Sequence, residues 1–135
     1  MSRENVEVVR GMLERYSADD IEGFLEHWAP DAEWTAVAFA PIEGKARTYR
    51  GHAGFRQFHA DSHETFAGQR IEITELCDAG DRVLALGELR ARGAASGAGF
   101  AARMGWLFEL RDGKVVRGRD YLDQREALEA AGLRE

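Results

Sequence analysis

Residues 99–110, GFAARMGWLFEL, and residues 114–122, KVVRGRDYL, decide the fold class. In the first stretch every even position from Phe100 to Leu110 is apolar, while the odd positions include Arg103 and Glu109. This period of two is typical of a strand with one buried face. Residues 111–113, RDG, have the length and composition of a hairpin turn. The two stretches should therefore be antiparallel neighbours.

Three further segments outside this pair also have strand character. Residues 70–77 and 83–92 are separated by the turn sequence DAGD, and AASG at 94–97 turns the chain back into residue 99. Residues 31–41 alternate as well and should form an earlier strand that ends near Pro41. A polar loop through Gly44 and Lys45 should then lead to residues 49–51.

Helical periodicity is concentrated in the first half of the chain. Apolar residues recur at spacings of three and four between Val6 and Tyr16, which predicts a helix that begins at Ser2. A second helix should run from Asp19 or Asp20 to Trp28, ahead of Pro30. A third should span 52–66, with Gly68 as its C-cap.

A short terminal helix should follow the strands, because Asp123 and Glu126 form a capping box and Gly132 follows at the end. Helices early and strands late indicate an α+β fold. We expect three N-terminal helices on a mainly antiparallel sheet, plus this C-terminal helix, in a single domain over 1–135.

The amino-acid composition argues against some classes of function. The 135 residues are 44% hydrophobic and 31% charged, with 24 acidic and 18 basic side chains and a net charge of -6. This balance argues against nucleic-acid binding. No apolar run approaches the roughly 18 residues of a membrane span, and the polar N-terminus is unlike a secretory signal, so we expect a cytoplasmic protein. The single cysteine, Cys77, excludes an internal disulfide.

Asp120 is the exception in the strand pattern. Alternation places it with Val116, Gly118 and Leu122, and it is the only charged residue on the apolar face of the last three strands. A carboxyl group among apolar neighbours loses hydration, which raises its pKa and makes it a candidate proton carrier. In the alternative interpretation Asp120 lies at the sheet rim, accepts a hydrogen bond and has a structural role.

Several motifs in this order resemble the nuclear transport factor 2-like superfamily, and more narrowly its SnoaL-like, or polyketide-cyclase-like, branch. They are WAPDAEW at 28–34, YRGH at 49–52, DGKVV at 112–116 and YLD at 121–123. The resemblance implies a conical fold in which three helices pack on a strongly curved sheet around an apolar pocket. It also implies a homodimer formed through the outer sheet face, where Arg103, Leu107, Arg117, Arg119 and Tyr121 should lie.

Catalytic positions of these relatives transfer only in part. Compared with the family's steroid isomerases, the base position is Ala36, the tyrosine position is Met12, and the second acid falls near Trp106. That mechanism therefore lacks its main groups. The polyketide cyclases would select Asp123, although the capping box already explains an aspartate there.

The epoxide hydrolases give the closer match, over residues 118–126, GRDYLDQRE, and they place a catalytic acid at Asp120. Their other catalytic positions are Gly87, Leu89, Trp34 and Ala36 in this chain. Shifting that strand by one residue would offer Glu88 and Arg90 instead, but the alternation argues against this shift.

These observations predict a pocket for a small, largely apolar molecule. Asp120 is the candidate acid/base for isomerisation, hydration, dehydration or cyclisation, without a cofactor. The alternative is a non-catalytic binding or accessory protein. The expected ligand-binding residues are His27, Trp34, Tyr49, Phe58, Met104, Trp106 and Phe108.

His59 and His63 share one side of the third predicted helix, with the i,i+4 spacing of many metal-binding pairs. Asp61 does not share their face, and no third ligand is evident. We therefore expect surface or half-buried histidines and no metal site.

Overall fold

The computed structural model describes residues 2–37 and 44–133. It contains four helices and six strands over this part of the chain. In chain order they are α1 (Ser2–Ser17), α2 (Ile21–Leu25), β1 (Trp28–Ala36), β2 (Arg47–Arg50), α4 (Gly51–Thr65), β3 (Phe66–Ala79), β4 (Arg82–Gly93), β5 (Gly99–Arg111), β6 (Lys114–Tyr121) and α5 (Gln124–Ala130). None of the described helices is long and apolar enough to cross a membrane.

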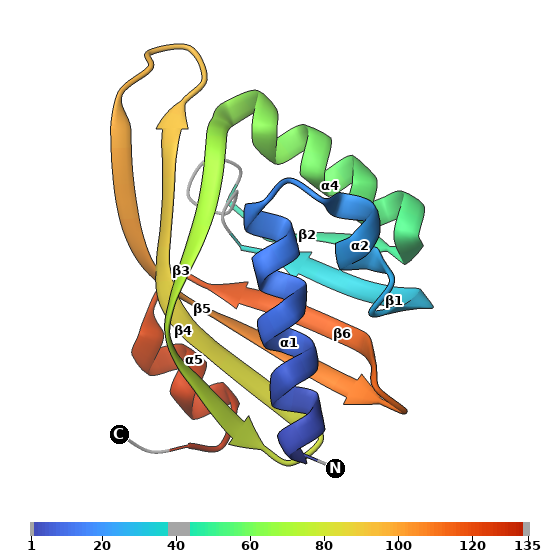
Figure 1. Cartoon of the computed structure of the whole chain (residues 1–135). Coiled ribbons are helices and arrows are strands. Elements are labelled where there is room, and N and C mark those ends of the chain that lie inside the picture. Colours follow the sequence, from blue (N-terminus) through green and yellow to red (C-terminus); the bar gives the residue numbers. More distant parts are fainter. Residues whose placement is uncertain (1, 38–43, 134–135) are drawn as a thin grey trace.

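The strands form one mixed sheet in the order β2-β1-β6-β5-β4-β3. All neighbours are antiparallel except β1 and β6, which pair in parallel. The long strands β3, β4 and β5 curve, and α1, α2 and α4 lie across one face of the sheet (Figure 1). The prediction of a curved, mainly antiparallel α+β architecture is therefore confirmed.

The main core lies between these helices and the inner face of the sheet. The predicted stripe on α1 is buried there, with Val9 and Met12 fully enclosed and Tyr16 only 7% exposed. Burial of such a stripe is the usual way in which an amphipathic helix is stabilised on a sheet.

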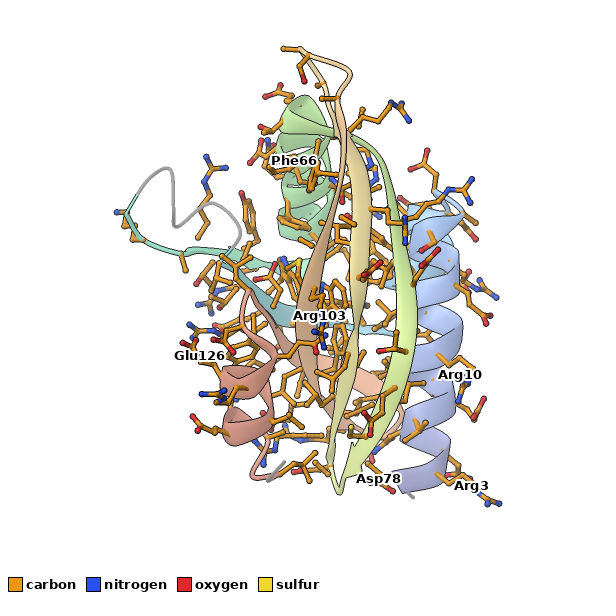
Figure 2. The ribbon with its side chains drawn as sticks, turned by 90° about the vertical axis from the view of Figure 1, so that its left-hand side faces the viewer. Arg3, Arg10, Phe66, Asp78, Arg103 and Glu126 are labelled. Atoms are coloured by element: carbon orange, nitrogen blue, oxygen red, sulfur yellow. The ribbon has the colours of Figure 1, made fainter. Side chains whose placement is uncertain are left out.

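The short helix α5 lies on the opposite face of the sheet from α1 (Figure 2). Leu84 and Leu86 pack there against Ala127 and Ala131. A Cβ atom on Gly105 would lie only 2.6 Å from the Ala127 Cβ, so a glycine lets α5 approach the sheet closely. Strand β4 is consequently buried on both faces from Val83 to Gly87.

One half of the predicted capping box at the start of α5 is confirmed, the half in which the Asp123 side chain accepts from the helix backbone. Asp123 accepts hydrogen bonds from the backbone N–H groups of Arg125 at 2.8 Å and Glu126 at 3.3 Å. Gly132 follows the helix with a φ of 76°, as a glycine just beyond a helix end commonly does.

The three helices are not all N-terminal to the sheet: α4 follows β1, as the order of the predicted segments implied, and also β2. Helix α2 ends at Leu25 rather than Trp28, since the chain enters the sheet earlier: the Val115 N–H donates to the His27 carbonyl at 2.8 Å. Pro30, which has no N–H, lies where the register between β1 and β6 shifts.

Three local features differ from the prediction. Residues 47–50 form the edge strand β2, paired with β1, which the alternation did not predict. Gly68 does not cap α4; it lies inside β3 with a φ of 64°, at a register shift between Ala67 and Arg70. Val115 is buried in place of Val116, because a register shift opposite Glu109 and Leu110 changes the alternation at the start of β6.

Gly118 is a close-approach position in the wall of the core. The Trp34 and Phe108 rings stack with centroids 6.1 Å apart and an interplanar angle of 18°. A Cβ atom on Gly118 would lie 2.9 Å from Cε3 of Trp34 and 3.1 Å from Cδ1 of Phe108. Both rings are packed in the core, so moving either of them away from an added atom would cost free energy.

We predict that Gly118→Ala lowers the free energy of unfolding by about 1–3 kcal/mol, because the added methyl overpacks this ring pair. Gly11→Ala is the matched control: nothing lies within 4 Å of its Cβ position on α1. That substitution should stabilise by about 0.5–1 kcal/mol through helix propensity. Urea denaturation of both variants measures the difference, and equal effects would contradict the packing argument.

Candidate active site

A cavity of about 140 Å³ lies between the helices and the inner face of the sheet. Its walls come from α1, α2, α4 and strands β1 and β3 to β6 and are almost entirely apolar. Six of the predicted site residues line this cavity. They are Trp34, Phe58, Met104, Trp106, Phe108 and Asp120.

Two predicted ligand-binding residues are not among the lining residues. The Tyr49 hydroxyl donates to Asp61 at 3.0 Å and accepts from Arg47 at 2.9 Å, while its ring contacts Phe58 at 5.5 Å between centroids. His27 is half-buried beyond the end of α2, where burial lowers its pKa. Tyr49 thus reaches the cavity wall through Phe58, and His27 lies elsewhere.

Asp120 points inward, as the alternation predicts, and only 3% of it is exposed. It pairs with Trp106 across the antiparallel β5–β6 ladder. The Val37 N–H donates to its Oδ1 at 2.6 Å. Of the charged side chains in the described ranges, this is the one that is buried.

Burial raises the pKa of Asp120 to about 6, although the Val37 amide, its own backbone amide and the Arg119 charge each lower it. Loss of hydration therefore outweighs the hydrogen bonds. A carboxyl group with this pKa exists in both protonation states near neutral pH, which is what general acid/base catalysis requires.

Trp34 also lines the cavity, and its side chain carries a buried polar atom. Its indole Nε1 is buried and has no hydrogen-bond partner among the described residues. An unpaired buried donor costs about 1–3 kcal/mol. Trp34 lies opposite Gly118 in the β1–β6 pair, two residues along β6 from Asp120.

Three polar residues that sequence reasoning missed line another part of the cavity. The Tyr16 hydroxyl donates to Gln69 Oε1 at 2.6 Å, and Gln69 Nε2 donates to Ser62 Oγ at 3.1 Å. Ser62 in turn donates to the His59 carbonyl at 3.2 Å. Burial raises the pKa of Tyr16 far above its usual range, so this phenol remains a donor.

A signal for these residues was present in the sequence. Ser62 occupies the apolar face of the third predicted helix, and Gln69 alternates with Ile71 and Ile73. Each is a polar residue on an apolar face, the same kind of exception as Asp120. Tyr16 was not recognised as a site residue, because its ring fits the apolar stripe of the first helix.

Two positions that the resemblance to steroid isomerases makes catalytic carry no ionisable group in this chain. Met12 and Ala36 are fully buried and apolar. Asp123 is exposed and engaged with the N-terminus of α5, outside the set of cavity-lining residues. Asp120 is the acid that the cavity contains.

Comparisons with known proteins agree with this architecture. The model of the SnoaL-like domain family matches residues 9–118. A nuclear transport factor 2-like protein of unknown function from Burkholderia pseudomallei is 25% identical, with a TM-score of 0.80 over 93% of this chain and 95% of that one. TerC, in a crystal structure with polyporic acid, is 28% identical, with a TM-score of 0.80 over 96% and 98%.

A putative SnoaL-like polyketide cyclase from a Jannaschia species shares the fold at 19% identity, with a TM-score of 0.75 over 96% of this chain and 92% of that one. No curated protein matches the sequence. Helices across one face of a curved mixed sheet, with an apolar cavity between them, are the architecture of a nuclear transport factor 2-like protein. Within that superfamily the chain belongs to the SnoaL-like family.

We predict that Asp120 makes stability fall as pH rises. Its folded pKa of about 6 lies above the unfolded value of about 3.9, so the folded chain binds the extra proton between these two pH values. Ionisation should therefore lower the free energy of unfolding by about 2 kcal/mol between pH 4 and pH 7. Asp120→Asn keeps an acceptor for Val37 and removes this dependence.

Urea denaturation across that pH range, for wild type and Asp120→Asn, measures the effect. Asp31→Asn, at an exposed position on β1, is the control and should follow the wild type. Parallel curves for wild type and Asp120→Asn would show that Asp120 titrates normally.

Proposed function

We propose that this protein binds a small, largely apolar molecule in its cavity and catalyses proton transfer on it, with Asp120 as general acid/base. The buried carboxyl with a pKa of about 6 carries this proposal. Structural ionisable groups are seldom kept in an apolar wall, because burial of the charged form is costly.

The proposed chemistry needs no oxidant or reductant. In its ionised form Asp120 removes a proton from a carbon beside a carbonyl group, and the C–H electron pair moves toward the carbonyl oxygen as an enolate forms. Asp120 then returns the proton to another atom of the substrate. With Oδ1 bonded to Val37, Oδ2 is the oxygen that carries the proton.

Trp34 would stabilise the charge that develops on the substrate oxygen. Its buried N–H has no partner in the described chain but is enclosed by protein, so the indole would have to turn toward the cavity to donate to the substrate. A donor placed in a dry cavity is more effective than one in water, because the surrounding dielectric is low. Tyr16 is less suited, because its hydroxyl already donates to Gln69.

The cavity limits the size of the ligand. An apolar cavity of about 150 Å³ accommodates a single benzene ring, and the volume here is about 140 Å³. We infer a substrate with one ring or an equivalent branched chain buried in the cavity. The crystal structure of TerC with polyporic acid supports small-molecule binding by this fold.

A non-catalytic binding protein is the alternative function. The short Val37 hydrogen bond favours it, because this contact alone gives Asp120 a structural purpose in joining β6 to the end of β1. The two functions differ in whether the Asp120 proton moves during ligand turnover.

Deuterium exchange on cyclohexanone, a single-ring ketone, tests the catalytic proposal. Wild type in D₂O should accelerate α-deuteration over buffer, measured by proton NMR. Asp120→Asn should lower this acceleration by about 100-fold or more, the usual contribution of a general base. Asp31→Asn should retain the wild-type rate.

Binding is measured separately through the fluorescence of Trp34 and Trp106, which line the cavity. Quenching by cyclohexanone in both wild type and Asp120→Asn, without enzymatic exchange in either, would favour the binding protein. Equal exchange rates in the two proteins would exclude Asp120 as the base.

We also propose that two copies associate through the outer sheet face. Arg103, Arg117 and Arg119 lie exposed on strands whose inner face lines the cavity. Leu107 and Tyr121 pack beside α5, so this helix covers part of the surface. The strip formed by β6 and β1 is the proposed contact.

Light scattering at micromolar concentration should give twice the mass of 15.1 kDa. Arg119→Glu should shift the protein toward the monomer, because a reversed charge in a shared face disfavours association. A wild-type monomer under these conditions would contradict the proposed dimer.

A further inference from the structure

Asp19, His59 and His63 converge at a point outside the cavity lining. Their nearest ligand atoms all lie within 4.8 Å of one another, and His59 Nε2 is 3.3 Å from Asp19 Oδ1. The two histidines lie one turn apart on α4, with ring centroids 4.1 Å apart. Asp19 comes from the turn between α1 and α2, where its φ of 63° is left-handed. Sequence spacing alone did not reveal this third group.

His63 is oriented as a metal ligand needs to be. Its Nδ1 lies 2.9 Å from the carbonyl oxygen of His59. A carbonyl only accepts, so Nδ1 carries the hydrogen in this bond and the lone pair of the neutral ring lies on Nε2. A metal-bound histidine usually donates its other ring N–H to a carboxylate, a backbone carbonyl or water.

His59 faces the same point as the other two groups: its Nε2 already contacts Asp19, and its side chain is 22% exposed. The Asp19 side chain is 77% exposed, which leaves the group open to solvent ions.

We propose that Asp19, His59 and His63 form a binding site for a divalent transition-metal ion, with Zn²⁺ as the probe. Two imidazoles and one carboxylate are a ligand set that such ions favour. Tetrahedral bonds of about 2.1 Å place neighbouring ligand atoms about 3.4 Å apart. The Asp19–His59 pair already has a separation close to this value, and rotation of side chains would bring His63 into place.

The same contacts have a simpler explanation for two of the three groups. Without a metal, His59 donates a hydrogen bond to Asp19, which ties the turn to α4. That bond does not use Nε2 of His63. A metal ion would use all three groups and leave a fourth position for water, as in open zinc sites.

The consequence is a cross-link between the α1–α2 turn and α4. Helix α4 carries Phe55, Phe58 and Ser62 into the cavity wall, and α1 carries Tyr16. The proposed ion would therefore clamp the helical cover of the cavity. The site does not depend on the proton-transfer chemistry of Asp120, so either proposal can fail without the other.

Titration of EDTA-dialysed protein with Zn²⁺, in competition with a chromophoric chelator, tests the site. Wild type should bind one equivalent with micromolar or tighter affinity. Asp19→Asn and His63→Ala should each weaken binding at least about tenfold. Asparagine is tolerated at positive φ, so Asp19→Asn preserves the turn. His27→Ala, a half-buried histidine outside the group, should bind as wild type does.

Imidazole nitrogen chemical shifts supply a second measurement on the folded wild type. Addition of Zn²⁺ should move the signals of His59 and His63 and leave those of His27 and His52 unchanged. Affinity weaker than about 1 mM, equal affinity in wild type and Asp19→Asn, or unmoved signals of His59 and His63 would each overturn the proposal.

Discussion

The parallel pairing of β1 with β6 is the constraint on which the pocket depends. It places Trp34 opposite Gly118, which leaves room for the Trp34 ring to stack on Phe108. It also brings the end of β1 to Asp120, whose carboxyl accepts the Val37 amide. The other strand pairs are antiparallel. A parallel pair needs a long connection, and here that connection includes α4 and four strands, β2 to β5. Of these elements, α4, β3, β4 and β5 contribute to the cavity wall.

The cavity combines two opposing requirements. Apolar walls provide most of the burial that stabilises the core, yet the same walls raise the free energy of an ionised Asp120. The Tyr16, Gln69 and Ser62 group avoids this conflict, because each member is neutral and hydrogen-bonded. Asp120 retains the conflict, since the hydrogen bonds to its carboxyl do not offset desolvation. The hydrogen bonds within the Tyr16, Gln69 and Ser62 group satisfy its polar atoms, whereas an ionised Asp120 is not fully stabilised by its surroundings. The proposed chemistry is therefore assigned to Asp120.

Period-two alternation was sufficient to predict the strands of the second half and the inward direction of Asp120. It failed at Val115 and Val116, because a register shift changes the facing of residues without any mark in the composition. It also missed β2, a four-residue edge strand whose arginines and threonine show no apolar face. Helical periodicity extended α2 to Trp28, because a tryptophan at that spacing is buried equally well at the start of a strand. Contacts between distant segments, such as Asp19 with His59, have no sequence signal at all.

Helix α4 connects the two sites that we propose. Phe55, Phe58 and Ser62 occupy its cavity-facing side, while His59 and His63 face the α1–α2 turn. The hydrogen bond from Ser62 to the His59 carbonyl, and that from His63 to the same oxygen, join these sides through one backbone atom. A rotation of α4 that tightened the histidine group would therefore also move the polar wall of the cavity. Because packed interiors yield little volume, such a rotation would change the cavity shape rather than be absorbed locally.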